Sequence, residues 1–292
     1  MLRDEYKENL ISRFAGGLRK YLDCKIIRSD YRVQTMKKII GVELMESIGL
    51  QFIGQTKHSH LGPSDQYFGK PQPPIQQEFD KTQPVVKLPK PSEITTEFVD
   101  VRKIIEQRKS IRNYAESPLT IDQLSYLLWC TQGVKENFYG TATLRNVPSA
   151  GARHAFETYL LINNVEGIKP GLYRFLVLEH CLVNISLEED IADKITKACL
   201  NQNFIKSSAV TFIWVAVPYR MNWRYGERGY RYLYLDAGHV CQNLYLSAES
   251  INCGTCAVAA YSDDELNQLL GLEGKEQFVI YLATVGIKSG YK

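Results

Sequence analysis

Three cations and a hydroxyl group occur within five residues in the segment from Arg108 to Arg112, which reads RKSIR. Side chains of an extended chain alternate between two sides, so Arg108, Ser110 and Arg112 are expected to face the same way. Guanidinium forks and a hydroxyl that converge on one point suit a phosphate group. The spacing therefore indicates a phosphate site, with a solvated basic turn as the alternative that it leaves open.

Three further segments place small residues or a cation where a ligand could approach the backbone. The segment PSAGARH, which starts at Pro148, has small residues and Gly151, which let the backbone come close to a planar ligand. Gly254, in the run NCGTC, allows a similar approach. Lys288 ends the run VGIK, where a predicted strand delivers a cation. Each segment alone is a weak signal.

The elements that must position these residues are predicted from hydrophobic periodicity and capping signals. Apolar residues at Phe98, Val101, Ile104 and Ile105 share one face and predict a helix over residues 93–107. Further predicted elements are a helix that opens with the capping box Thr120–Gln123 and ends at Gly133, a helix over 232–250, a short helix capped by Ser262, and strands over 157–163, 182–185, 209–217 and 277–285. Helices that alternate with buried strands predict a layered α/β domain of about 200 residues.

The chain before residue 95 has a different character. Apolar residues four apart predict amphipathic helices over residues 5–23 and 34–50. The stretch from about residue 55 to residue 91 is polar and rich in proline, which excludes helix and disfavours a central strand. We interpret this stretch as an extended arm that lies over another part of the protein, with a disordered linker as the alternative. We therefore predict two parts, residues 1–95 and residues 96–292.

The composition restricts the class of protein. The 292 residues carry a formal net charge of +3, too small to indicate a nucleic-acid or polybasic membrane partner. No run reaches the roughly 18 apolar residues of a membrane-spanning helix, and the first residues, MLRDEYKENL, are too charged for a signal peptide. Seven scattered cysteines do not suggest a disulfide framework. These features predict a cytoplasmic protein that binds neither nucleic acid nor membrane.

Cys253 and Cys256 form a C-x-x-C motif, a pattern that can serve thiol redox chemistry or zinc binding. A thioredoxin-like site follows a strand and opens a helix, whereas this motif follows a predicted helix and precedes a predicted strand. A zinc site needs a second pair of ligands, and none is suitably placed. We therefore predict no metal site and keep a thiol oxidoreductase as a minor alternative.

Taken in chain order, RKSIR, PSAGARH, YGERGYRYLYLDAGHVCQN, NCGTCAVAAY and the terminal VGIK resemble the nitroreductase-like flavoprotein superfamily, and most closely its SagB-type dehydrogenase branch. That branch includes azoline dehydrogenases, which convert thiazolines and oxazolines in peptides to thiazoles and oxazoles. The resemblance covers about residues 50–292. It implies an α+β fold with a central mixed sheet flanked by helices, in which two identical chains bury two FMN molecules between them.

The resemblance also implies roles for the segments described above. The FMN phosphate and the ribityl and pyrimidine end are assigned to Arg108, Ser110 and Arg112, with Lys109 contributing backbone and Lys288 reaching the phosphate as a late cation. The loop along the isoalloxazine ring, contributed by the partner chain, is assigned to Pro148, Ser149, Ala150 and Gly151. The backbone that approaches the reactive edge of the flavin is assigned to Gly254 and Thr255.

One departure from the branch affects the expected chemistry. Where the branch often has Lys-Tyr, this chain has Arg224-Tyr225. The pair in azoline dehydrogenases resembles proton-removing machinery, but a guanidinium stays protonated and cannot act as a base. This weakens the case for azoline oxidation. Arg224 can still lower the pKa of Tyr225 and make the tyrosine the catalytic base, while simple packing among neighbouring tyrosines is the alternative.

The predicted function is that of an FMN-dependent oxidoreductase with two half-reactions at one flavin. NAD(P)H reduces the flavin, and a small organic acceptor then enters the same pocket and takes the electrons. Substrate dehydrogenation with oxygen as the acceptor is the alternative enzymatic direction. A non-enzymatic FMN carrier, or a scaffold subunit of a peptide-modifying complex, is the alternative from another class of protein.

Overall fold

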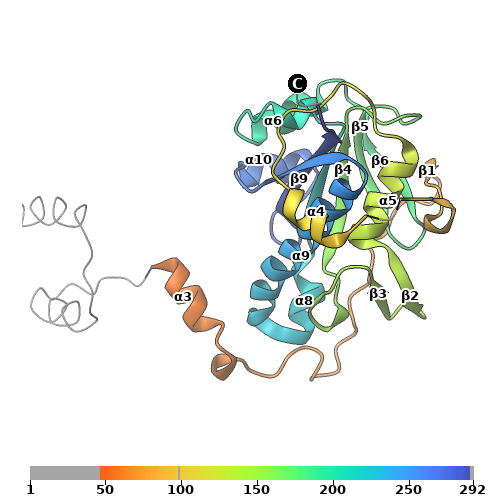
Figure 1. Ribbon diagram of the computed structural model, residues 1–292. Coiled ribbons are helices and arrows are strands. Elements are labelled where there is room, and N and C mark those ends of the chain that lie inside the picture. The colour runs from red at the N-terminus through yellow and green to blue at the C-terminus, as the bar shows by residue number, and fades with distance from the viewer. Residues whose placement is uncertain (1–46, 98, 290–292) are drawn as a thin grey trace, which may run out of the picture. The chain divides into compact units, whose positions relative to one another are not determined.

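The computed structural model describes residues 47–97 and 99–289 (Figure 1). The chain divides into two units, Met1–Gly54 and Gln55–Lys292. The described part of the first unit is residues 47–54, which form most of helix α3 (Ile48–Gln55), a helix with no buried residue. The predicted helix over residues 5–23, and most of the one over 34–50, lie outside the described residues.

The second unit is built on a seven-stranded sheet with the order β1-β6-β5-β4-β7-β9-β8. The strands are β1 (Val85–Lys87), β4 (Phe156–Ile162), β5 (Gly171–Leu176), β6 (Cys181–Ser186), β7 (Val210–Ala216), β8 (Cys253–Val258) and β9 (Phe278–Ile287). A separate hairpin pairs β2 (Val134–Phe138) with β3 (Ala142–Arg145). Every pair of neighbouring strands in the large sheet is antiparallel, which corrects the expectation of a mixed sheet.

Short connections and two-sided burial explain this sheet. Only residues 177–180 join β5 to β6, whereas a parallel pair needs a crossover of a dozen residues or more. Strands β4 and β7 are buried along their whole length, as the apolar run over 209–217 predicts. Alternate residues of β4 enter different cores, with Leu160 on one face of the sheet and Leu161 on the other. An apolar run therefore marks a strand covered on both faces, and it does not decide the strand's direction.

Helices cover both faces of the sheet (Figure 1). On one face α5 (Ile121–Gln132) packs against α9 (Gly229–Ser250), and α9 lies against β8 and β9. The opposite core is closed by α6 (Ile191–Ala198), α7 (Phe204–Ser207) and α10 (Asp263–Leu269). Two further helices, α4 (Val101–Gln107) and α8 (Pro218–Tyr225), contact α9. The predicted α+β fold with a central sheet flanked by helices is confirmed, and no helix of the described part is long and apolar enough to cross a membrane.

The helix predicted over residues 93–107 is shorter than expected. It begins at Val101, because the Asp100 carboxylate accepts a backbone N–H bond and caps the first turn there. On its predicted apolar face, Val101 and Ile105 are exposed, and Phe98 lies outside the described residues. Apolar spacing alone thus overstates how much of this helix is buried.

The Pro-rich arm packs on the body of the second unit through hydrogen bonds. The Gln66 N–H donates to the Trp223 carbonyl oxygen at 2.8 Å, and the Trp223 indole N–H donates to the Lys70 carbonyl oxygen at 2.9 Å. Further along, the Gln77 N–H donates to Glu157 Oε1 at 2.8 Å. The regular elements of the arm are β1 and the short 3₁₀ turns η1 (His58–His60) and η2 (Pro91–Glu93). These hydrogen bonds place the arm against α8 and β4.

The capping box of α5 provides a test of how this helix begins. Thr120 Oγ1 accepts the Gln123 N–H at 3.1 Å, and the Gln123 side chain accepts the Thr120 N–H at 3.0 Å. We expect Thr120→Ala to lower the free energy of unfolding by about 1 kcal/mol in urea titrations. Ser262, which was predicted to cap α10, makes no side-chain capping bond, so Ser262→Ala is the matched control and should be nearly silent. Equal losses in the two variants would contradict this account.

Candidate functional site

The RKSIR segment lies along the outer edge of β8, the last strand of the sheet. Ser110 forms a parallel bridge with Thr255, and the Ile111 N–H donates to the Thr255 carbonyl oxygen at 2.9 Å. A few residues later, Tyr114 bridges to Lys288 at the end of β9. The fold therefore brings together three of the four segments that the sequence singled out.

Two glycines permit this close docking. An ideal Cβ atom on Gly254 would lie 2.7 Å from Ile111 Cβ, and one on Gly286 would lie 2.7 Å from the Tyr114 ring. Both distances are too short for real side chains, so any larger residue would push the segment off the sheet edge. Gly254, which was predicted to admit a flavin, is thus needed here for the packing of RKSIR against β8.

Arg108, Ser110 and Thr255 gather near Tyr245, a residue of α9 that the sequence did not single out. The Tyr245 hydroxyl lies 2.9 Å from Ser110 Oγ and accepts the Ala257 N–H at 2.8 Å. The Arg108 Cζ atom lies 5.1 Å from the centre of the Tyr245 ring. We name Arg108, Ser110, Tyr245 and Thr255 the Tyr245 cluster.

The other two cations of the predicted phosphate site are arranged differently. The Arg112 Cζ atom lies 5.8 Å from the centre of the Phe204 ring. Its guanidinium therefore lies by Phe204, whereas that of Arg108 lies by Tyr245. Only an isolated bridge, and no regular ladder, holds this segment, so strand alternation does not extend along it. Lys288 Nζ donates to Glu249 Oε1 at 2.5 Å, and that carboxylate would repel a phosphate. The prediction that Arg112 shares the side of Arg108 is therefore corrected.

The Tyr245 cluster offers donors of the kind that a phosphate needs. Within the described residues Arg108 and Arg112 form no ion pair. Thr255 Oγ1 is buried without a hydrogen-bond partner. Such groups are expected where a polar ligand completes a site. Lys109 is exposed beside them. This donor set fits an anionic group, with Arg108 and Ser110 as its main contacts.

The PSAGARH segment is held by Asp236, a buried carboxylate in α9. Ser149 Oγ donates to Asp236 Oδ2 at 2.6 Å, and the Ala150 N–H donates to the same carboxylate at 3.3 Å. Ser149 Oγ in turn accepts the His154 N–H at 2.9 Å. Burial raises the pKa of Asp236, while the hydrogen bond from Ser149 lowers it. Pro148, at the start of the loop, is exposed. Asp236 therefore fixes a loop whose position the sequence could not give.

Gly151 brings this loop against the predicted pair Arg224 and Tyr225. Its φ angle is +56°, and an ideal Cβ atom there would overlap the Tyr225 hydroxyl and lie 3.3 Å from Arg224 Nε. Tyr225 packs edge-on against Tyr232, with ring centres 4.9 Å apart. Arg224 Cζ lies 5.7 Å from the centre of the Tyr225 ring. We name Ser149, Gly151, Arg224, Tyr225 and Asp236 the Asp236 cluster.

The two clusters lie on opposite flanks of α9. Tyr245 follows Asp236 by nine positions, which is about 14 Å along a helix axis and about 180° around it. The two residues mark the edges of the buried face of α9, whose middle includes Leu233, Val240 and Leu244. One chain therefore presents two separate clusters of polar residues.

The C-x-x-C motif lies within β8, and not ahead of a strand as predicted. Cys253 and Cys256 are buried, and burial raises the pKa of the Cys253 thiol to about 12. Residues three apart in a strand point to opposite faces, so these thiols cannot pair, which argues against a thiol oxidoreductase.

Burial and the nearby Arg145 lower the pKa of His154 to about 3, so this imidazole is neutral at pH 7. In the part of the chain that the structure describes, no group of three His, Cys, Asp or Glu residues could hold a metal ion.

Gly254→Ala tests the docking of RKSIR on β8. The added Cβ would collide with Ile111, so we expect the free energy of unfolding to fall by roughly 1–3 kcal/mol, as at other overpacked sites. Ile111→Gly in the same chain removes the Cβ that the collision involves and should recover part of that loss in a double-mutant cycle. Gly62→Ala, where an added Cβ meets nothing within 4 Å, is the matched control. Strict additivity of the Gly254 and Ile111 effects would show that the two sites do not touch.

Comparison with known proteins identifies the family. A model of the nitroreductase family matches residues 105–287. The protein named "Putative nitroreductase MJ1384" of Methanocaldococcus jannaschii is 34% identical over 193 residues, which cover 66% of this chain and 93% of that protein. The trifolitoxin-processing protein TfxB of Rhizobium leguminosarum bv. trifolii is 31% identical over 130 residues, which cover 43% of this chain and only 35% of TfxB.

Solved structures share the fold. A "putative nitroreductase" from Anabaena variabilis is 28% identical, with a TM-score of 0.55, and the match covers 65% of this chain and 38% of that one. The E. coli microcin synthetase McbBCD complex with truncated pro-MccB17 is 18% identical with a TM-score of 0.53, covering 69% of this chain and 77% of the other, and shows the fold alone. Because the family model spans more than half of the chain, from before the RKSIR segment to the end of β9, this protein belongs to the nitroreductase family.

Proposed function

We propose that this protein is an FMN-dependent oxidoreductase that works as a homodimer. The observation that carries the proposal is the placement of the two clusters on opposite flanks of α9, about 14 Å apart along the helix. A flavin needs a phosphate site and also contacts along its ring system. Two copies of the chain, each giving one cluster to each cofactor, would complete two sites, and membership of the nitroreductase family supports a flavin there.

Exposed apolar side chains support a second copy of this chain as the partner. Val101 and Ile105 of α4 are 63% and 55% exposed, and Tyr234 and Leu235 of α9 are each 60% exposed. Large apolar side chains exposed on two helices that touch each other indicate interaction surfaces. Since α9 also carries Asp236 and Tyr245, an interface there would bring the half-sites of two chains together.

The Tyr245 cluster is the proposed phosphate site. The phosphate of FMN is strongly anionic, and the Arg108 guanidinium and the Ser110 hydroxyl would donate to it. Tyr245 orients Ser110, and the unpartnered Thr255 hydroxyl offers a further donor. Lys288 would contribute less, because Glu249 already accepts a bond from its ammonium group. Gly254 and Thr255 would present main-chain atoms to the cofactor next to this site.

The chemistry would be divided between the cofactor and the chain. When bound, the flavin would supply hydride transfer. Asp236 would hold the loop from Ser149 to Gly151 in place for contacts along the ring. Tyr225 is the candidate for moving a proton at the substrate, because its hydroxyl lies against the loop at Gly151 and the Arg224 guanidinium lies beside its ring. Arg224 itself keeps its proton and orients the tyrosine or an anionic substrate group.

NAD(P)H is the proposed electron donor, and a small organic molecule is the proposed acceptor. Both would use the same site in turn, so we expect ping-pong kinetics. The ordered motifs support placement near the SagB-type dehydrogenase branch. The presence of Arg224 where that branch often has lysine disfavours azoline oxidation as the reaction, since arginine cannot serve as the base.

A second candidate is a subunit of a peptide-modifying complex. TfxB is named for trifolitoxin processing, and the McbBCD structure holds a truncated pro-peptide. Those properties belong to the two relatives, and they favour this candidate over a free-standing carrier. Reduction of the bound flavin by NADH or NADPH in the isolated protein would favour the oxidoreductase, whereas activity that needs added subunits would favour the second candidate.

Mass analysis of the released cofactor, together with sedimentation, tests the proposed function directly. We expect FMN and not FAD, because the donor set is compact and the chain has no dinucleotide fingerprint G-x-G-x-x-G. Sedimentation at micromolar concentration should show a dimer. Finding FAD, finding no flavin even after reconstitution, or finding a monomer saturated with FMN would refute the proposal.

Arg108→Ala should weaken FMN binding without unfolding the protein. Removing a charge-assisted hydrogen bond to phosphate typically costs about 1.5–3 kcal/mol, which corresponds to roughly ten- to hundred-fold weaker binding. Lys288→Ala is the comparison variant and should have a smaller effect, because that ammonium is already paired with Glu249. Fluorescence titration of the apoprotein with FMN measures both. An unchanged affinity in Arg108→Ala would rule out the phosphate assignment.

Tyr225→Phe separates a proton-transfer role from simple packing against Tyr232. In the first case FMN binding and its reduction by NAD(P)H stay unchanged, and only a substrate half-reaction that requires a proton slows down. In the second case the substitution is nearly silent in every half-reaction. Stopped-flow measurements with a proton-demanding acceptor over a range of pH distinguish the two. Equal rates for the two proteins at every pH would leave Tyr225 as a packing residue.

A further inference from the structure

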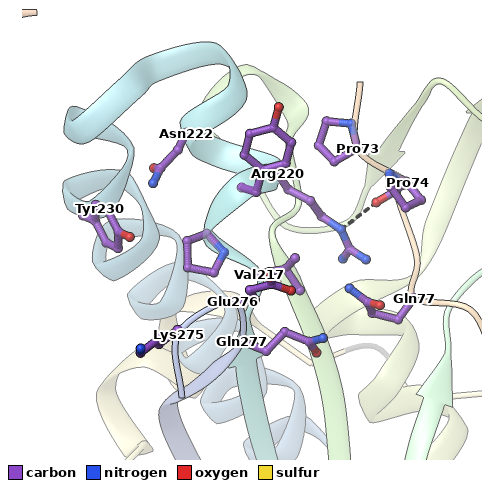
Figure 2. A pocket seen from close by; sticks show the side chains of 12 residues that line it. Pro73, Pro74, Gln77, Val217, Arg220, Asn222, Tyr230, Lys275, Glu276 and Gln277 are labelled. Carbon is purple, nitrogen blue, oxygen red and sulfur yellow. Dashed lines mark hydrogen bonds between the residues drawn. The ribbon is translucent and has the colours of Figure 1, made fainter. Parts of the chain in front are cut away.

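A pocket of about 490 Å³ lies between the arm, the first turns of α8 and the turn before β9. Figure 2 shows Pro74 and Gln77 of the arm on one side of it, Arg220 of α8 reaching toward them, and Gln277 close by. No residue of the Tyr245 cluster or the Asp236 cluster lines this pocket. Its volume lies in the range of sites for small organic molecules.

Arg220 is buried in the wall of the pocket with one hydrogen-bond donor unused. Its side chain is 2% exposed, Nε donates to the Pro74 carbonyl oxygen at 2.7 Å, and Nη2 donates to Glu157 Oε1 at 2.6 Å. The remaining terminal nitrogen, Nη1, has no partner among the residues that the structure describes. Figure 2 shows the guanidinium end between Pro74 and Gln77. A buried donor of this kind requires an acceptor, which a ligand or a water molecule can provide.

The charges around Arg220 favour an anion as that acceptor. Arg145 is also buried, at 4% exposed, and interacts with the same carboxylate, that of Glu157. Burial and the proximity of Arg220 lower the pKa of Arg145 to about 9, so it remains protonated at pH 7. Two buried guanidiniums therefore share one carboxylate, and one positive charge has no counter-ion among these three groups. Low-dielectric surroundings of this sign stabilise a bound negative group.

We propose that the pocket binds the carboxylate group of a small organic acid, with Arg220 as its anchor. A carboxylate oxygen supplies the missing negative charge, and it accepts from Nη1, which is sealed from solvent in the free chain, once a glutamine side chain of the pocket turns aside. At the mouth of the pocket Lys275 and Glu276 are exposed and opposite in sign, so they do not decide the charge of the ligand. Gln77 and Gln277 are amide side chains that can turn to cover or admit it.

The anchor lies one helical turn from the candidate catalytic pair. Arg220 precedes Arg224 by four positions on α8, or about 6 Å along the helix axis. An acid held at Arg220 by its carboxylate would therefore lie one helical turn from this pair, with neither Arg224 nor Tyr225 in the lining of the pocket. This link to the reaction rests on the proposed function, whereas binding of the carboxylate in the pocket does not.

Calorimetric titration of the full-length protein with benzoate and with benzamide tests the site. The two probes share size and shape, and only benzoate carries a charge. We expect benzoate to bind with a Kd of about 1 mM and benzamide at least about ten-fold more weakly. Gln277→Trp fills the pocket without altering the Arg220–Glu157 pair and should abolish benzoate binding. Glu273→Trp, on the same turn but outside the pocket, is the matched control and should leave it unchanged.

Arg220→Lys keeps the positive charge but loses the guanidinium fork, and should weaken benzoate about ten-fold. If that variant does not fold, the two tryptophan variants decide the question. Equal affinity for both probes, or no saturable benzoate binding up to roughly 10 mM, overturns the proposal. So does binding that persists in Gln277→Trp and disappears in Arg108→Ala, because benzoate would then lie at the Tyr245 cluster. A change in flavin content alone bears on the proposed function and not on this pocket.

Discussion

Burial of one face of α9 against the sheet is the constraint on which both the Tyr245 cluster and the Asp236 cluster depend. Leu233, Val240 and Leu244 are fully buried on that face, and each such side chain contributes about 1.5–3 kcal/mol of hydrophobic stabilisation. Asp236 and Tyr245 lie at its two edges, where the helix turns away from the core. A slip of α9 by one residue would rotate both edges by about 100° and break both clusters together.

The polar residues at these edges, Asp236 and Tyr245, hold two loops in defined positions against the packed helix. Asp236 would be costly to bury alone, and the bonds from Ser149 and the Ala150 N–H offset that cost. Tyr245 is satisfied in the same way by Ser110 and the Ala257 N–H. The same bonds that satisfy a buried group therefore hold a loop, so that both loops are positioned without a disulfide or a metal ion in the described residues.

Some segments could be predicted from sequence because their residue types reflect local structure, such as a glycine where two backbones come close or an apolar run in a buried strand. RKSIR and Gly254 meet at one sheet edge, and β7 is buried as its apolar run indicates. Asp236 could not be found in this way, because a single acid on an amphipathic helix does not reveal which loop it holds. β5 was missed because its sequence, GLYRFL, does not alternate, and it is buried on both faces with Arg174 inside. In general, local chemistry was predictable, and the contacts between segments distant in the chain were not.

Dividing each site between two chains would couple cofactor binding to association. Within residues 47–97 and 99–289 of one chain, Arg108 and Arg112 form no ion pair, the buried Thr255 hydroxyl has no partner, and apolar side chains on α4 and α9 are exposed. The cofactor would satisfy the polar groups, and the second chain would cover the apolar ones while adding ring contacts. The cofactor would then bind more tightly to the dimer, and the second chain would bind more tightly to the cofactor-loaded chain, by the same factor. In the proposed dimer, with the two clusters at opposite edges of one helix, the surface that stabilises association would also be the surface that assembles the site.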